Sequence, residues 1–141
     1  MKPMLLSSAE TYPEGDEWIY EAKYDGYRAL LLWEKETPTI ISRNHRDITP
    51  LFPELVDFCK SYFLLVQPFL PLIFDGEIVY LENNYRSNFS IVQSRGKLAA
   101  KETIQQASKR FPCQYLVFDL LKAKGEDLTA RPLSERKKQL A

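Results

Sequence analysis

Residues 18–34 read WIYEAKYDGYRALLLWE, and this stretch decides the expected fold. The first run, 18–24, is rich in aromatic and β-branched residues and predicts a strand. Asp25-Gly26 is typical of a tight hairpin turn, because glycine tolerates positive φ. The apolar run at 27–34 is then expected to return as the partner strand. The sequence therefore predicts an antiparallel hairpin near the N-terminus.

The rest of the chain alternates short apolar runs with helical patterns. Further strands are predicted at 39–43, at 72–80 and at 114–121, where QYLVFDLL is expected to be buried. Helices are predicted at 54–64, from Ser87 or Asn88 to 93, at 101–109 and from Pro132 to 140. Antiparallel strands interrupted by helices indicate an α+β domain, with helices packed on antiparallel sheets. A length of 141 residues fits a single domain.

Charge and cysteine content exclude several classes of protein. Nineteen basic residues balance nineteen acidic ones, so there is no bulk positive charge for histone-like DNA binding, and any nucleic-acid contact must come from a local patch. Cys59 and Cys113 are too few for a disulfide scaffold, and with a single histidine they argue against a Cys/His zinc site. Neither a signal-peptide pattern nor an apolar run long enough for a membrane helix is present, which predicts a cytoplasmic protein without membrane contact.

Residues 21–28, EAKYDGYR, carry the most distinctive chemistry. Alternation along a strand would place Glu21, Lys23 and Asp25 on one face. A lysine that is desolvated in a pocket, close to a cation such as Arg28, would present a free amine that can act as a nucleophile. The alternative is a strand lysine that is simply solvated.

Three further motifs follow in order, and each one alone has an ordinary explanation. Ser42-Arg43-Asn44 can be a solvated turn. Asp75 and Glu77, in FDGEIV, would point the same way along a strand and could hold Mg²⁺ or accept ribose hydroxyls. The same residues can also be an Asp-Gly turn beside a solvated glutamate. Phe118, in YLVFDLL, can be a core residue.

Taken together and in order, EAKYDGYR, SRN, FDGEIV and YLVFDLL resemble four successive motifs of the covalent nucleotidyltransferases. That superfamily comprises ATP-dependent DNA ligases, RNA ligases and mRNA-capping enzymes. The resemblance runs from residue 21 to about residue 121 and extends into the helix at 132–140. Within the superfamily the motifs look most like the ligase domain of bacterial ligase D, the enzyme of non-homologous end joining. The resemblance implies part of an ATP-grasp-like nucleotidyltransferase fold, that of a DNA ligase adenylation domain.

The resemblance assigns the nucleotide chemistry to five residues. Lys23 would attack the α-phosphorus of ATP, release pyrophosphate and carry AMP as a phosphoramidate. Glu21 would lie near the adenine amino group, and Phe118 would stack on the adenine. Arg28 and Glu77 would hold the ribose, with Glu77 also near the Mg²⁺ or Mn²⁺ ion.

The resemblance also implies a DNA substrate. AMP would pass to a 5′-phosphate at a DNA nick, and the 3′-hydroxyl would displace it to seal the strand. Arg43 and Arg46 would contact DNA phosphates. The expected partners are nicked or broken double-stranded DNA and the bacterial Ku end-binding protein, and the expected role is DNA repair and recombination by end joining.

The family pattern continues with a Glu-Gly metal-binding motif, a Lys-x-Lys motif and an oligonucleotide-binding fold. After residue 121, Gly125-Glu126 has the reverse order, Lys122-Ala123-Lys124 follows the fourth motif too closely, and the oligonucleotide-binding fold is missing. We therefore expect residues 1–141 to be the N-terminal part of an adenylation domain, inactive or weakly active alone. We also expect self-association, through strand edges or by exchange of the C-terminal helix. Two alternatives stay open: an RNA ligase or capping-type nucleotidyltransferase, and a non-catalytic nucleotide- or DNA-binding module.

Overall fold

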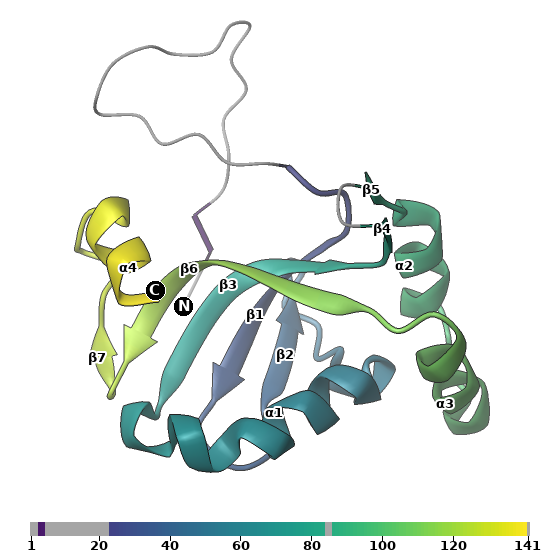
Figure 1. The fold of residues 1–141 in the computed structure, drawn as a ribbon, viewed down its shortest axis with the longest axis horizontal. Coiled ribbons are helices and arrows are strands. Elements are labelled where there is room, and N and C mark those ends of the chain that lie inside the picture. Colours follow the sequence, from purple (N-terminus) through teal and green to yellow (C-terminus); the bar gives the residue numbers. More distant parts are fainter. Residues whose placement is uncertain (1–2, 5–22, 84–85, 141) are drawn as a thin grey trace, which may run out of the picture.

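A five-stranded antiparallel sheet forms the centre of the computed structural model, which describes residues 3–4, 23–83 and 86–140 (Figure 1). Its strand order is β2-β1-β3-β6-β7. The strands are β1 (Tyr27–Trp33), β2 (Thr39–Ser42), β3 (Leu72–Val79), β6 (Gln114–Ala123) and β7 (Glu126–Asp127). Two short strands, β4 (Leu81–Asn83) and β5 (Arg86–Ser87), pair with each other as a separate hairpin.

Helices connect the strands and cover the sheet. They are α1 (Pro53–Val66), α2 (Phe89–Gly96), α3 (Lys101–Arg110) and α4 (Leu133–Leu140), with the 3₁₀ turns η1 (Thr49–Leu51) and η2 (Gln67–Phe69) on either side of α1. α1 begins at a proline, whose missing N–H costs nothing in the first turn. Asn88 caps α2, because its side-chain oxygen accepts a hydrogen bond from the Ile91 N–H at 3.3 Å. No helix in the described part of the chain is long and apolar enough to cross a bilayer.

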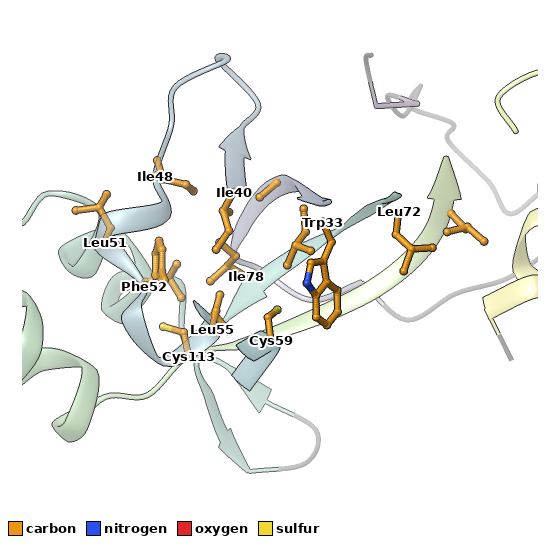
Figure 2. Packing of buried hydrophobic residues seen from close by; sticks show 14 of the residues in the cluster. Trp33, Ile40, Ile48, Leu51, Phe52, Leu55, Cys59, Leu72, Ile78 and Cys113 are labelled. Carbon is orange, nitrogen blue, oxygen red and sulfur yellow. The ribbon is translucent and has the colours of Figure 1, made fainter. Parts of the chain in front are cut away.

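The main core lies between one face of the sheet and α1. Alternation along β1 points Ala29, Leu31 and Trp33 to this face, where they pack in one cluster with Leu55 and Cys59 of α1. Figure 2 shows these α1 side chains opposite Trp33 and the neighbouring strands. Side chains of α2 and α3 join the same cluster, and Leu140 of α4 (Leu133–Leu140) packs against it.

The opposite face of the sheet is less apolar. Leu30, Ile73 and Leu121, from three neighbouring strands, form a small cluster of their own. Arg28 and Asp75 lie two residues from Leu30 and Ile73 and so share their face. α4 packs against β6 (Figure 1), and its Arg136 bonds to this face. This face therefore positions the polar residues of the candidate site.

Glycine at position 76 permits a close approach between β3 and β6. A Cβ atom there would collide with the Leu116 carbonyl oxygen and lie 2.8 Å from the Tyr115 Cζ. The ring of Tyr115 occupies that space, and its hydroxyl donates to the backbone carbonyls of Ala29 at 2.8 Å and Phe74 at 3.2 Å. The pairing of β3 with β6 shifts register beside this glycine, which is the local irregularity that a glycine in a strand often marks.

The structure confirms the α+β class and most predicted elements, with α1 and β6 each two residues longer at the C-terminal end than predicted. One burial prediction was wrong. QYLVFDLL is buried only in its second half, from Asp119 to Leu121, while Val117 is 40% exposed. In the buried half, Asp119 bonds to Arg136 of α4, Leu120 packs in the main core, and Leu121 packs in the small cluster with Leu30 and Ile73.

Two local predictions also fail. The predicted strand at 18–24 lies mostly outside the described residues, but Lys23 and Tyr24 are described and are not in a strand; β1 begins only at Tyr27. The common strand face predicted for Lys23 and Asp25 is therefore wrong. The alternative of a turn at Asp75-Gly76 is wrong as well, because both residues lie in the middle of β3, paired on both sides.

Candidate active site

A buried ion pair between β1 and β3 anchors the polar face of the sheet. Arg28 donates from Nε to Asp75 Oδ1 at 2.7 Å and from Nη2 to Oδ2 at 2.6 Å. Asp75 is fully buried, so its carboxylate depends on this bidentate partner. Burial raises the pKa of Asp75, with Arg28 opposing the rise, while the hydrogen bonds to Asp75 raise the pKa of Arg28. The guanidinium is thus held in one orientation as a permanent cation.

A second buried ion pair lies beside the first. Asp119 is the pairing partner of Asp75 on the adjacent strand, so the two carboxylates are neighbours, and Asp119 adds to the rise in the pKa of Asp75. Arg136 of α4 donates from Nε to Asp119 Oδ1 at 2.8 Å and from Nη2 to Oδ2 at 3.1 Å. Two adjacent buried carboxylates are therefore balanced by two guanidinium groups, one from β1 and one from α4.

Arg28 also joins the aromatic and acidic residues that the motifs predict. Its guanidinium carbon lies 4.7 Å from the ring centroid of Phe118, although β1 and β6 are separated by β3. Glu77 pairs with Arg28 across the β1–β3 ladder. Burial raises the pKa of Glu77, while Arg28 and a hydrogen bond from the Gly26 N–H lower it. The structure thus brings Arg28, Glu77 and Phe118 together on one face.

The lysine of the first motif lies just before this group. Lys23 is exposed, and within the described ranges its amine makes no hydrogen bond or ion pair. The chain after it is tied to the domain, because the Asp25 N–H donates to Ser87 Oγ at 3.0 Å and Gly26 contacts Glu77. Glu21 lies outside the described residues. The placement of the lysine amine beside Glu77 and Phe118 stays a prediction.

The loop after β2 presents two further predicted residues. The Ser42 carbonyl accepts from the His45 N–H at 2.9 Å and the Ser42 hydroxyl accepts from the Arg46 N–H at 3.1 Å, with His45 in the left-handed region at φ 63°. This tight turn leaves Arg43 and Arg46 exposed. A shallow pocket lies beside it, lined by Pro3, Arg28, Ala29, Leu30, Ile41, Ser42, Arg43 and His45. Arg43 and Arg28 therefore share one hollow.

The described part of the chain has no group of three His, Cys, Asp or Glu side chains that could hold one metal ion by themselves. Glu77 is a partly buried carboxylate on the site face. Mg²⁺ is commonly held by one or two carboxylates together with substrate phosphates and water. The residues present fit such a shared site, with Glu77 as the protein ligand.

The motifs missed two residues of the site. They are Asp119, the neighbour of Phe118 in YLVFDLL, and Arg136, in the helix predicted from Pro132 to 140. Arg136 is nevertheless 6% exposed, and the next residue, Lys137, donates to the Phe118 carbonyl oxygen at 2.8 Å. The available signal was the spacing of Leu133, Arg136 and Leu140, which lie on one face of α4.

Comparison with known proteins agrees with this geometry. A family profile described as "ATP dependent DNA ligase domain" matches residues 3–141. The chain is 44% identical over 140 residues to the bifunctional non-homologous end joining protein LigD of Bacillus subtilis, covering 99% of this chain and 22% of LigD. It is similar to the crystal structure of the ligase domain of M. tuberculosis LigD, with a TM-score of 0.66 and 27% identity over 85% of this chain and 34% of that one.

A second solved structure, a mycobacterial DNA ligase D complexed with ATP and MES, matches with a TM-score of 0.66 and 28% identity, over 85% of this chain and 34% of that one. This chain thus spans about a fifth of LigD and a third of the solved ligase chains. The likeness confirms the predicted fold, and the range matched by the family profile, residues 3–141, spans all four motifs. The chain belongs to the family of ATP-dependent DNA ligase domains.

Proposed function

We propose that this chain supplies the lysine-bearing part of a DNA ligase that takes AMP from ATP and uses it to seal DNA. The observation that carries the proposal is the meeting of Arg28, Glu77 and Phe118 on one face of the sheet. These residues come from three different motifs, and each has the chemistry that the resemblance requires. Family membership and the ATP-complexed ligase D structure support ATP as the donor.

Each residue of the site would have its own role in the transfer of AMP from ATP to the lysine. The Lys23 amine would form a nitrogen–phosphorus bond to the α-phosphorus as the bond to pyrophosphate breaks. Arg28, fixed by Asp75, would present a cation that needs no reorganisation, and Glu77 would hold the ribose and the Mg²⁺ or Mn²⁺ ion. When bound, the ion would neutralise phosphate charge. Phe118 would offer its ring to the adenine, with Glu21 near the exocyclic amine.

The DNA-facing part of the proposal rests on the loop after β2. Arg43 and Arg46 are exposed on a tight turn, and the chain has no net charge, so phosphate contacts would depend on this local patch. We propose nicked or broken double-stranded DNA as the acceptor, Ku-dependent end joining in repair as the setting, and the cytoplasm as the location. The LigD relative carries non-homologous end joining in its name.

Residues 1–141 would correspond to the N-terminal part of the adenylation domain, as the partial cover of the ligase structures supports. Residues 122–141 do not hold the Glu-Gly motif of the family, and their Lys122-Ala123-Lys124 lies too close to the fourth motif to be its Lys-x-Lys motif. Because those groups would help to position the triphosphate, we expect little lysine–AMP from ATP itself. An activated nucleotide tests the lysine without that requirement.

The experiment is labelling with the imidazolide of AMP, which transfers AMP to amines without a pyrophosphate leaving group. We expect the label on Lys23 in preference to other lysines, protection by ATP but not GTP, and loss of the label in Lys23→Ala. Lys35→Ala, which removes another exposed lysine, is the matched control and should label normally. Even labelling of all surface lysines would refute the nucleotide site, and protection by GTP would point to a capping-type enzyme.

A further inference from the structure

Helix α1 carries apolar side chains on two sides. Its inward side packs into the main core. Its outward side presents Phe58, Tyr62 and Leu65, which are 62%, 45% and 71% exposed, and Phe69 of η2 continues the row at 50% exposed. We name these four residues the apolar stripe. A surface helix is usually apolar only toward its core, so the stripe exceeds what the fold of this chain requires.

The apolar stripe is the main concentration of exposed apolar surface in the described ranges. Five of the eight large hydrophobic residues that are exposed there belong to α1 and η2, namely the four residues of the stripe and Leu64, which is 80% exposed. Aromatic side chains carry about 150–250 Å² each, so the exposed parts of Phe58, Tyr62 and Phe69 alone present roughly 300 Å². Such a patch is typical of an interaction site rather than of scattered surface residues.

The charges at the two ends of the stripe differ in sign. Asp57, exposed, precedes Phe58 at one end. At the other end the Lys124 N–H donates to the Phe69 carbonyl at 2.8 Å, and its ammonium lies 5.6 Å from the Phe69 ring centroid. A surface with one acidic and one basic end is complementary to itself only when two copies run antiparallel. Antiparallel helices also place opposite helix dipoles side by side.

The spacing of the stripe has the same symmetry. Residues 58, 62, 65 and 69 are separated by four, three and four positions, so the row reads the same in both directions. We propose that two copies of this chain associate through the apolar stripe with their α1 helices antiparallel. Phe58 then faces Phe69 of the second copy, and Tyr62 faces Leu65.

The size of the stripe sets the expected strength. A standard interface buries about 800 Å² per partner, and the stripe with its rim is at or below that size. The association is therefore weak and depends on concentration. It is also separate from the candidate active site, because α1 packs on the face of the sheet opposite Arg28 and Asp75. The proposal accordingly stands or falls independently of the proposed function.

Sedimentation equilibrium of the full chain, from low to high micromolar concentration, tests the proposal. We expect a monomer–dimer equilibrium that Leu65→Glu weakens by about tenfold or more. Asp57→Lys and Lys124→Asp each place like charges together at both ends of the dimer and should weaken it about fivefold. The double variant Asp57→Lys with Lys124→Asp exchanges the two charges and should return the affinity to within about twofold.

Lys60→Glu is the matched control, since it reverses an exposed charge on the same helix away from the stripe. A wild-type chain that is monomeric at all concentrations would overturn the proposal. So would a dimer indifferent to Leu65→Glu, which would place the contact elsewhere, such as a strand edge. A double charge exchange that dimerises no better than the single variants would overturn the antiparallel arrangement. Circular dichroism checks folding, and the exposed charge variants decide the matter if Leu65→Glu fails to fold.

Discussion

Replacing Arg136 with methionine would leave the Asp119 carboxylate buried without its guanidinium partner. Asp119 is 1% exposed and lies beside Asp75, which is itself fully buried and negatively charged when ionised. Removing one partner of a buried ion pair costs about 3–5 kcal/mol. Because α4 packs mainly on β6 and can move locally, we take the lower figure, about 3 kcal/mol. With a urea m value of about 1.5 kcal/mol/M, the unfolding midpoint would fall by about 2 M.

The assay is urea unfolding followed by tryptophan fluorescence, since Trp33 is buried in the core. The double variant Asp119→Asn with Arg136→Met removes both charges, and Asn can still accept the hydrogen bond that Asp119 Oδ1 takes from the Leu120 N–H. It should cost only about 1 kcal/mol. Lys138→Met, at an exposed position of α4, should change stability by less than about 0.5 kcal/mol. If Arg136→Met alone cost less than 1 kcal/mol, or the double variant regained nothing, the uncompensated charge would not be the cause.

Three other perturbations have defined outcomes. Burial raises the pKa of Glu77, so the folded state holds that proton to a higher pH than the unfolded chain. The contribution of Glu77 to stability therefore falls as pH rises above the ordinary value of 4.5. Glu77→Gln removes this fall and should raise the melting temperature at neutral pH but not at pH values below 4.5; an equal gain at both would contradict the reasoning. Burial raises the pKa of Cys59 to about 11 and that of Cys113 to about 12. Neither thiol should therefore react with a thiol reagent at pH 8 until denaturant is added. Prompt labelling of the folded chain would contradict their burial. Replacing Arg43 and Arg46 with alanine should weaken binding to nicked duplex and flatten its dependence on salt, whereas an unchanged slope in a salt titration would place the phosphate contacts elsewhere.

The elements that local patterns specify were predictable from the sequence. Helix α1 has a proline at its start and apolar residues at helical spacing, and α2 has an asparagine cap, so the information lies within a few residues of each element. The short strands β4, β5 and β7 have two or three residues each, too few for an alternation to be read. β7 pairs with the end of β6, whereas β4 and β5 pair only with each other.

The candidate site was predictable only as a set of motifs. Arg28 and Asp75 are 47 positions apart, and their bidentate contact depends on the register of β1 against β3, which no local pattern fixes. In the sequence, Arg136 is one of several charged residues of a helix. Its role depends on the packing of α4 on β6, which brings it to Asp119. A buried arginine cannot be told from a solvated one when its carboxylate partner comes from another element. The motifs thus named Arg28, Glu77 and Phe118, while the residues that hold them in place came from the fold.

The contacts of Met4 join residues that are synthesised far apart in time, and this affects when the polar face can fold. Its carbonyl oxygen accepts from Arg28 Nη2 at 2.7 Å, and its sulfur lies 3.9 Å from Arg136 Nη2, 132 positions along the chain. At about 5–20 residues per second, a ribosome adds Met4 roughly ten seconds before Arg136. Asp119 is added 17 positions before Arg136, so for roughly one to three seconds its carboxylate lacks the guanidinium that will neutralise it. Within residues 3–140 the polar face can therefore be completed only after α4 has been made, well after the pairing of β1 with β3.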